Sequence, residues 1–434
     1  MESPIRKTQK NKWLGFSQKN FSERIDTLEE NGYLNAEFSE ILKNNINLPR
    51  EIANQMTENS IGTFALPFSV APHFLIDGKE YVIPMVTEEP SVVAASSYAA
   101  KLIGKSGGFF TKIHDRKMTG QVILYNIENI SEAVDSIRRH EGEILCKAND
   151  SYPSIVARGG GAKKIHTEYF SDGGSYFLSV YLTVDVQEAM GANIINTMLE
   201  GIRSLLEKIT GSEGLMSILS NYATESLVTS KCKVNIKYLS NNLKEASNIA
   251  EKIEFASVYA KLDIYRAATH NKGIFNGIDA IAIATGNDWR AIDAGGHAFA
   301  SRNGKYEGLT TWHFDRKNGL LVGEITLPMP IAAVGGSIGL NPTVKSAFNL
   351  LCNPDAKTLA SIVVSVGLAQ NFAALKALVS TGIQKGHMKL QARSLALLAG
   401  ADKDEVSHVT EMLLLEKHMN LSAAENILKK LRNI

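Results

Sequence analysis

Hydrophobic residues recur along this chain with two different periods, and each period predicts a different kind of element. Helical spacing of apolar residues predicts amphipathic helices over residues 21–31 and 36–44. Two apolar runs then flank Asp77 and Gly78, a turn dipeptide that predicts a β-hairpin. An alanine-rich stretch over residues 91–103 predicts another helix. The first third of the chain therefore mixes helices with strands.

The pattern changes in the middle of the chain. Residues 121–125 predict a strand and residues 131–147 a helix. Alternation of apolar residues over 178–186 predicts the clearest strand of the sequence, and residues 190–206 return to helical spacing. Strands mixed with helices in this way predict a separate α+β lobe over residues 117–219, inserted into a larger one.

Residues 358–375 carry no charge and approach the length of a membrane span. They also contain Ser361, Ser365, Gln370 and Asn371, whose polar groups are costly to transfer into lipid. The stretch therefore predicts a helix buried inside the protein, apolar on nearly all sides, and no membrane partner.

A third unit follows, built from helical patterns alone. Helical spacing predicts helices over residues 388–399, 403–417 and 423–432. Ser422 and Glu425 have the spacing of a capping box for the last of these helices. The predicted fold class is α+β, with a large domain over 1–116 and 220–381, an inserted domain over 117–219 and a helical C-terminal unit over 382–434.

Composition narrows the class of protein further. The 434 residues exceed what one hydrophobic core usually organises, which favours several domains. Basic and acidic residues number 46 and 45, so the net charge of +1 argues against nucleic acid as a partner. The three cysteines are odd in number and far apart, which favours a reducing compartment over a disulfide framework. The polar start lacks the apolar region of a secretory signal, so we expect a cytoplasmic protein.

Four segments concentrate small, polar and charged residues that packing does not require. They are Glu88–Ser91, Tyr265–Gly273, Ala284–Arg290 and Gln384–Met388. Taken alone, each has a simpler explanation. A Gly-Asn-Asp run is usually a turn, a lysine before glycine is usually solvated, and a lone histidine is more often structural than catalytic.

In this order the four segments resemble the class II, mainly bacterial, hydroxymethylglutaryl-coenzyme A reductases. The resemblance covers nearly the whole chain. It implies a reductase that converts 3-hydroxy-3-methylglutaryl-CoA to mevalonate and CoA by two hydride transfers from NADPH, in the mevalonate pathway of isoprenoid biosynthesis. The segments that look like signatures of the family are Glu58–Gly62, Glu89–Ser91, Asp185–Asn193, His270–Gly273, Gly286–Arg290, Gly367–Asn371 and Gly386–Met388.

The resemblance also implies an architecture. It predicts a large substrate-binding domain with a buried central helix, and a small inserted nucleotide-binding domain that is not Rossmann-like. The C-terminal helical unit is then a flap that closes over the site.

The residue types in these segments suit the implied reaction. Each hydride addition places negative charge on the former carbonyl oxygen, so a cation and a proton donor must face it. Lys272 can supply the cation, and Glu89 and Asp288 are the paired carboxylates, one of which stays protonated if they lie close together. By family analogy, Asp288 holds and tunes Lys272 while Glu89 donates a proton. His387 fits as the general acid that protonates the departing CoA thiolate.

The segment around Glu89 leaves a choice between two neighbouring acids. Consecutive residues of an extended segment point to opposite sides, so Glu88 and Glu89 cannot both face the site. The resemblance favours Glu89, and it implies a bidentate contact from Arg266 to the substrate carboxylate. The residues implied around the hydroxymethylglutaryl group are Ser91, Arg266, Asn276, Gln370 and Asn371.

The chain carries no sequence typical of a Rossmann or Walker-type nucleotide site, because the triple glycine at 159–161 lacks the third glycine of Gly-x-Gly-x-x-Gly. Instead, Gly191 lies where the alternating strand meets a helix, so a phosphate can approach free amide groups there. An ordinary strand-to-helix turn is the simpler alternative. With the resemblance, the expected coenzyme contacts are Glu188, Met190, Gly191, Ala192, Asn193, Asn221, Ser151 and Tyr152, and no metal is expected.

Coenzyme preference depends on the segment before the triple glycine. NAD-preferring relatives carry an aspartate there, and an acidic side chain bonds a ribose 2'-hydroxyl but repels a 2'-phosphate. Alignment places Ser151 or Tyr152 opposite that aspartate, which favours NADPH. A gap moved by one residue places Asp150 there instead, which favours NADH. Arg158 and nearby lysines either supply positive charge to a phosphate or are simply solvated.

The resemblance implies a homodimer, or a multiple of dimers, with shared active sites. The expected small-molecule partners are hydroxymethylglutaryl-CoA, mevalonate and CoA. Two alternatives stay open, namely the same fold oxidising mevalonate with NAD, as in catabolic relatives, and a non-catalytic CoA-binding protein. Retention of all four catalytic positions argues against the second alternative.

Overall fold

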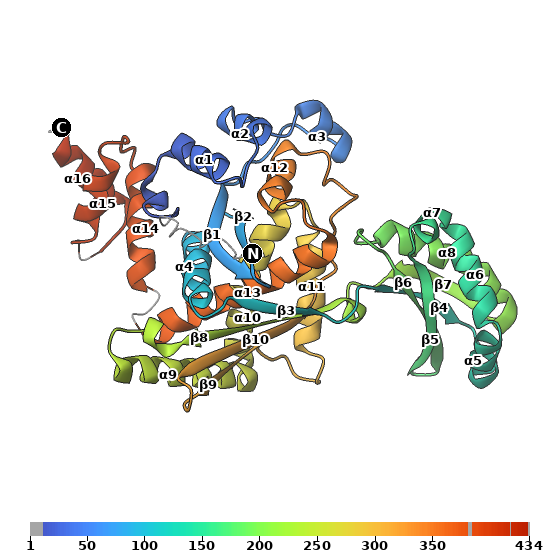
Figure 1. The fold of residues 1–434 in the computed structure, drawn as a ribbon. Helices are drawn as coiled ribbons and strands as arrows, with labels where there is room; N and C mark the ends of the chain where they lie inside the picture. Colours follow the sequence, from blue (N-terminus) through green and yellow to red (C-terminus); the bar gives the residue numbers. More distant parts are fainter. Residues whose placement is uncertain (1–11, 381–383, 417, 433–434) are drawn as a thin grey trace, which may run out of the picture.

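The computed structural model describes residues 12–380, 384–416 and 418–432. These residues form a mixed α+β architecture, which confirms the predicted fold class. Figure 1 shows a large central body, a smaller lobe to one side and the C-terminal helices on the other side. Each of the three parts has a hydrophobic core of its own.

The central body is organised around a six-stranded sheet in the order β2-β1-β3-β8-β10-β9. β1 and β3 run parallel, and all other neighbouring strands run antiparallel. The predicted hairpin is confirmed, because Ile76 pairs with Lys79 around the Asp77-Gly78 turn. The strands are β1 (Phe68–Ile76), β2 (Lys79–Val86), β3 (Phe109–Ile113), β8 (Leu227–Asn235), β9 (Thr310–Asp315) and β10 (Leu320–Pro328).

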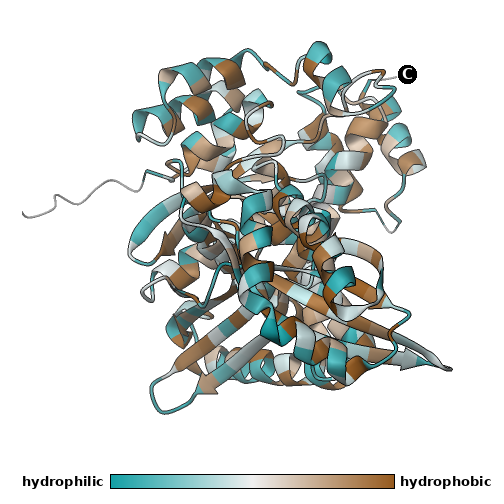
Figure 2. Cartoon of the chain, turned by 90° about the vertical axis from the view of Figure 1, so that its right-hand side faces the viewer, coloured by the Kyte–Doolittle hydropathy of each residue, from teal (hydrophilic) through white to brown (hydrophobic). Residues whose placement is uncertain are grey.

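Helices pack on this sheet, and most helices in Figure 2 carry both hydrophilic and hydrophobic residues, as expected when one face is buried. Both predicted N-terminal helices are confirmed, and each starts at an asparagine. Asn20 accepts a hydrogen bond from Glu23 N, and Asn35 accepts one from Phe38 N, both at 3.0 Å. The helices of the central body are α1 (Phe21–Glu30), α2 (Ala36–Lys43), α3 (Arg50–Met56), α4 (Val92–Gly104), α9 (Leu243–Leu262), α10 (Ile264–Ala284), α11 (Trp289–Ala300), α12 (Pro342–Leu350) and α13 (Ala356–Val379).

α13 runs through the core of the central body, as predicted. Within the described part of the chain it is the one helix with the length and apolarity of a membrane span, and 72% of that apolar window is buried inside the protein. Its hydroxyl groups find partners on the sheet. Thr111 Oγ1 lies 2.8 Å from Ser361 Oγ, and Ser230 Oγ lies 2.9 Å from Ser365 Oγ. These bonds explain how a core helix accommodates polar residues.

The smaller lobe contains an antiparallel sheet in the order β5-β6-β4-β7. β6 confirms the strand predicted from alternation. The single helix predicted over 131–147 is wrong, because the chain breaks at His140 into two helices. His140 Nδ1 lies 2.8 Å from Ser136 O and takes part in ending the first helix. The elements are β4 (Met118–Tyr125), α5 (Ile130–Arg139), α6 (Glu141–Ser151), α7 (Pro153–Ala157), β5 (Gly161–Asp172), β6 (Ser175–Asp185), α8 (Ala192–Thr210) and β7 (Glu213–Leu219).

The smaller lobe joins the central body through two adjacent segments, residues 114–117 and 225–227, which we call the neck. His114 N donates to Leu227 O at 3.0 Å, and Lys117 N donates to Glu225 O at 2.8 Å. The chain therefore enters and leaves the lobe side by side.

The C-terminal unit consists of α14 (Gln384–Leu398), α15 (Val406–Leu413) and α16 (Leu421–Leu431). All three helices were predicted, with shifted bounds. The predicted capping box is wrong, because Asn420 caps α16 by accepting a bond from Ala423 N at 2.8 Å. Asparagine is as good a cap as serine, and its position two residues earlier decides where the helix begins.

Candidate active site

Glu89 lies in the short connection between β2 and α4. Its backbone N–H donates to Thr87 Oγ1 at 3.1 Å, and Ser91 starts α4 from a left-handed conformation with φ 74°. This turn leaves Glu88 exposed and Glu89 half-buried. The local geometry therefore presents Glu89 to the neighbouring helix α10.

α10 supplies the partners of Glu89. Lys272 Nζ lies 2.6 Å from Glu89 Oε2, and Asn276 Nδ2 donates to Glu89 Oε1 at 3.1 Å. Lys272 and Asn276 are four residues apart, so they lie on one face of the helix. The Lys272 side chain is 59% exposed and that of Glu89 35%, so this ion pair remains open to an incoming ligand.

Asp288 lies at the start of α11. Its Oδ1 accepts a bond from Ala291 N at 3.1 Å and lies 3.6 Å from Arg290 Nε. The structure pairs Lys272 with Glu89, and no hydrogen bond or ion pair between Lys272 and Asp288 occurs among the described residues. The two carboxylates expected to act together therefore have different partners in this arrangement.

A cavity of about 680 Å³ lies between the smaller lobe and the central body, with Asp288 on its wall. Gly191, with φ +94°, precedes α8, and a Cβ at this position would overlap the side chain of Val186. Only glycine suits this close approach, which leaves the first amide groups of a 19-residue helix facing the cavity. The lining residues are Tyr152, Arg158, Ala189–Ile194, Gly286–Asp288, Arg290, Ala332 and Val334–Ile338.

Four of the eight expected coenzyme contacts, Met190 to Asn193, line this cavity, and so does Tyr152. The other three lie elsewhere. Glu188 Oε2 accepts a bond from Ala356 N at 2.6 Å, at the start of α13. Ser151 Oγ donates to Lys147 O and packs against Gly201, while the carbonyl of Asn221 lies against Gly295.

Two of the residues expected around the acyl group lie next to Glu89, and the others lie elsewhere. Asn276 contacts Glu89, and Ser91 starts α4 directly after Glu89-Pro90. Gln370 is buried, and its Oε1 accepts a bond from Ser96 Oγ at 2.8 Å. Arg266 lies half-buried in the first turn of α10, where burial lowers the pKa of its guanidinium.

Asn371 and His270 belong to a buried network. Asn371 Oδ1 accepts bonds from Thr310 Oγ1 and Trp312 Nε1, both at 2.9 Å. His270 Nε2 lies 2.7 Å from Thr310 Oγ1 and 3.1 Å from Asn371 Nδ2. Burial lowers the pKa of His270 to about 3, so its ring is neutral at physiological pH. His270 and Asn371 therefore both make their contacts in the core rather than at an open surface.

His387 belongs to α14, but its side chain lies outside the described residues.

Two residues that hold the cavity together were not among the expected site residues, although Asn287 belongs to the signature segment Gly286–Arg290. Arg116 is buried in the neck and donates to the carbonyl oxygens of Gln187, Ala189 and Ile331 at 2.8, 3.0 and 2.5 Å. Asn287 clamps Ala332 through both its N–H and its carbonyl, at 2.7 and 3.1 Å. The described residues contain no cluster of three or more His, Cys, Asp or Glu side chains able to bind a metal ion.

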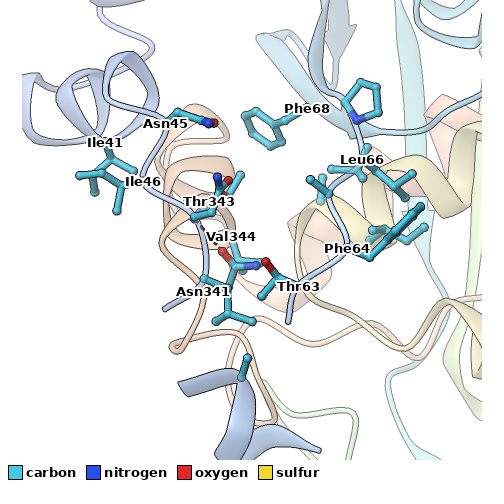
Figure 3. A pocket seen from close by; sticks show the side chains of 18 of the residues that line it. Ile41, Asn45, Ile46, Thr63, Phe64, Leu66, Phe68, Asn341, Thr343 and Val344 are labelled. Carbon is cyan, nitrogen blue, oxygen red and sulfur yellow. Dashed lines mark hydrogen bonds between the residues drawn. The ribbon is translucent and has the colours of Figure 1, made fainter. Parts of the chain in front are cut away.

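The signature segment Glu58–Gly62 lies next to a second cavity, of about 580 Å³. Figure 3 shows side chains from α2, from residues 63–68 and from α12 gathered around this space. Ile61 and Phe64 are 105% and 89% exposed, although both are large and apolar. Residues 61–64 therefore present apolar surface outward.

Comparison with known proteins identifies the family. The family model described as hydroxymethylglutaryl-coenzyme A reductase matches residues 20–392. The chain belongs to this family. It is therefore an oxidoreductase, and the resemblance inferred from the sequence is confirmed.

Individual hydroxymethylglutaryl-CoA reductases are similar over most of their length. The enzyme of Archaeoglobus fulgidus is 42% identical over 430 residues, covering 99% of this chain and 97% of the relative. The solved reductase of Streptococcus pneumoniae is 55% identical with a TM-score of 0.84, covering 96% of this chain and 99% of that one. A structure of the class II enzyme from the same organism, bound to NADPH in open conformations, also has a TM-score of 0.84 at 55% identity, covering 85% and 100%.

Proposed function

We propose that this chain reduces 3-hydroxy-3-methylglutaryl-CoA to mevalonate and free CoA, with NADPH as reductant. The observation that carries the proposal is the open cluster of Glu89, Lys272 and Asn276, on the same body as a cavity lined by Asp288 and the start of α8. The large central body then binds the substrate, the smaller lobe binds the coenzyme, and the C-terminal helices form the flap.

Lys272 and Glu89 act on the negative oxygen that each hydride transfer creates. The ammonium group of Lys272 stabilises the negative oxygen formed at each reduction, and Glu89, when protonated, donates the proton that oxygen needs. Asn276 fixes Glu89 Oε1, so Oε2 stays directed at Lys272. Asp288, on the cavity wall, is the carboxylate that holds Lys272 in the reacting state, after the family pattern.

The residues of the larger cavity suit a dinucleotide. NADPH supplies the two hydrides when bound. The start of α8 offers backbone N–H groups to a phosphate, and no acidic residue lies in the first turn of that helix. Gly191 lets the backbone approach closely, and Met190 and Asn193 flank it.

Preference for NADPH over NADH rests on the wall that carries Tyr152 and Arg158. Arg158 can pair with a 2'-phosphate, whereas Asp150 lies on α6 and outside the lining residues. We expect at least a tenfold higher kcat/KM with NADPH, equivalent to about 1.4 kcal/mol. Arg158→Ala should reduce this ratio, with the exposed Lys317→Ala as control. A wild-type preference for NADH would contradict the assignment.

His387 is the proposed general acid for the thiolate of CoA. His387→Gln should impair reduction of the thioester more than reduction of free mevaldehyde, because the aldehyde step has no thiolate to protonate. Steady-state rates with each substrate measure the difference. Equal losses in both half-reactions would remove this role from His387.

We also infer a homodimer that works in the cytoplasm. α9 exposes an apolar stripe whose members are 50–64% exposed at helical spacing, as expected for a surface covered by a second subunit. The stripe consists of Phe255, Val258, Tyr259 and Leu262. Tyr259→Asp with Leu262→Asp should yield monomers in sedimentation velocity runs, whereas Lys317→Asp should not. A monomeric wild-type protein would rule out the dimer.

The deciding experiment for the function is direct. Purified protein with hydroxymethylglutaryl-CoA should consume NADPH, seen as loss of reduced-nicotinamide absorbance, and should form mevalonate. A parallel run uses NADH. Absence of turnover with both coenzymes would overturn the proposal.

A further inference from the structure

Asp279 and Asp293 form an acidic pair on the same two helices that carry Lys272 and Asp288. Asp279 follows Lys272 by seven residues on α10, so it lies on the same face about 10 Å along the axis. Asp293 lies on α11, five residues after Asp288. The pair thus joins the helix that carries Lys272 to the helix that Asp288 caps.

α10 and α11 pack against each other, and the two side chains lie close enough to share a hydrogen bond once one carboxyl is protonated. Ionised carboxylates only accept hydrogen bonds, so such a contact requires a proton on one of them. Oδ1 of Asp279 and Oδ1 of Asp293 are buried, and neither accepts a hydrogen bond from any donor among the described residues. Two uncompensated charges at this place would be costly, and one shared proton removes most of that cost.

We propose that Asp279 and Asp293 share one proton and act as a positioning pair for Lys272. While the proton is present, the pair carries one negative charge, and Lys272 stays with Glu89 and the substrate oxygen. When the proton is lost, a second charge on the same helix face competes for Lys272 and opposes the negative oxygen of the reaction. This inference rests on the proposed role of Lys272.

The surroundings of the pair agree with such a proton. Burial, and then the charge of Asp293, raise the pKa of Asp279 to about 8 from its ordinary 3.8, and burial also raises the pKa of Asp293. Lys272 from α10 and His297 from α11 act in the opposite direction. As far as the described residues go, no charged group on β2, α4, α9, α12 or α13 acts on either carboxyl.

The proton can be observed without any activity. In resting protein labelled with carbon-13 at aspartate carboxyls, one carboxyl should titrate near pH 8, and its signal should disappear in both Asp279→Asn and Asp293→Asn. Asp404→Asn, at an exposed turn, should leave the signal in place. If no aspartate of the wild-type protein titrates above about pH 6, the pair does not share a proton and the inference fails.

Turnover then tests the link to Lys272. We expect kcat of the wild-type enzyme to fall severalfold to about tenfold as the pair ionises, because a charge about 10 Å away still acts inside a protein. Asp279→Asn keeps a hydrogen bond to Asp293 with a fixed single charge, so its kcat should lose this alkaline fall while KM for the coenzyme stays unchanged. An alkaline fall identical in wild type and Asp279→Asn would overturn the positioning role. An inactive wild type with a normal titration would instead refute the proposed function and leave the proton-sharing pair.

Discussion

α10 and α13 pack against each other through the core, and His270 of α10 bonds inside the protein as the polar residues of α13 do. Other polar residues of α10 behave differently. On α13, the side chains of Ser361, Ser365, Gln370 and Asn371 all have partners inside the protein. On α10, Lys272 and Asn276 reach outward to Glu89, and Asp279 keeps a buried oxygen without a partner.

The difference shows how to separate structure from chemistry among buried polar residues. A polar side chain whose hydrogen bonds are all made within the core stabilises one arrangement and has little left to offer a ligand. A polar side chain with unused capacity costs stability, and such costs are concentrated at functional sites. By this criterion α13 is a scaffold and α10 carries the site.

Replacement of Lys272 on α10 should have the largest effect. Lys272→Ala should lower kcat by about 10²–10³-fold, because it removes the cation that stabilises the negative oxygen. The fold should survive, since this side chain is 59% exposed. Stopped assays with purified protein measure kcat, and Lys317→Ala is the matched control. Near-normal turnover would show that α10 does not supply the catalytic cation.

Replacement of Asn371 on α13 should act on stability instead. Asn371→Ala leaves Trp312 Nε1 without its partner, at about 1–3 kcal/mol for a buried group left unpaired. Thr310 and His270 each lose one contact but keep each other. Urea unfolding at neutral pH gives the loss in the free energy of unfolding, with the exposed Asn318→Ala for comparison. Unchanged stability together with a large fall in kcat would show that Asn371 takes part in the chemistry and is not a scaffold residue.

Asp279 of α10 should make the stability of the protein depend on pH. Its pKa is raised from 3.8 to about 8 in the folded protein, so the folded state keeps a proton that the unfolded state releases in this range. The free energy of unfolding should therefore fall as pH rises from about 4 to about 8. Asp279→Asn lacks this loss and should gain stability relative to wild type as pH rises. Parallel urea midpoints for the two proteins across this range would exclude the raised pKa.

Removal of one α13 hydroxyl should have the smallest effect. Ser365→Ala deletes a donor to Ser361 O and a neighbour of Ser230, so about 1 kcal/mol of stability should be lost. kcat should not change. The same unfolding measurement decides it, and a change in kcat without a change in stability would show that α13 takes part in the chemistry.

Elements set by local pattern were predictable from the sequence. The Asp77-Gly78 hairpin, the apolar helix α13 and the alternating strand β6 follow from turn chemistry and periodicity. Gly191 was identified because a strand-to-helix turn is itself local. His140 and Asn420 show the limit, because one residue's geometry decides where a helix breaks or begins and periodicity does not register it.

Contacts between elements were the part that sequence could not supply. Motif order brought Glu89 and Lys272 together only by analogy, and it gave no orientation for Glu188 or Ser151. Asp279 and Asp293 match no motif, since their meeting depends on how two helices pack. A signal was nevertheless present, because each is a carboxylate inside an otherwise apolar helical run.

The neck makes the smaller lobe exchangeable. His114 pairs with Leu227 and Lys117 with Glu225, so a foreign lobe spliced at these points leaves the register of β3 and β8 untouched. Under the proposed function, exchange of this lobe should transfer coenzyme preference between reductases while the recipient keeps its substrate chemistry. Arg116 must travel with the graft, because one guanidinium fastens the turn before α8 to the recipient's own loop at Ile331.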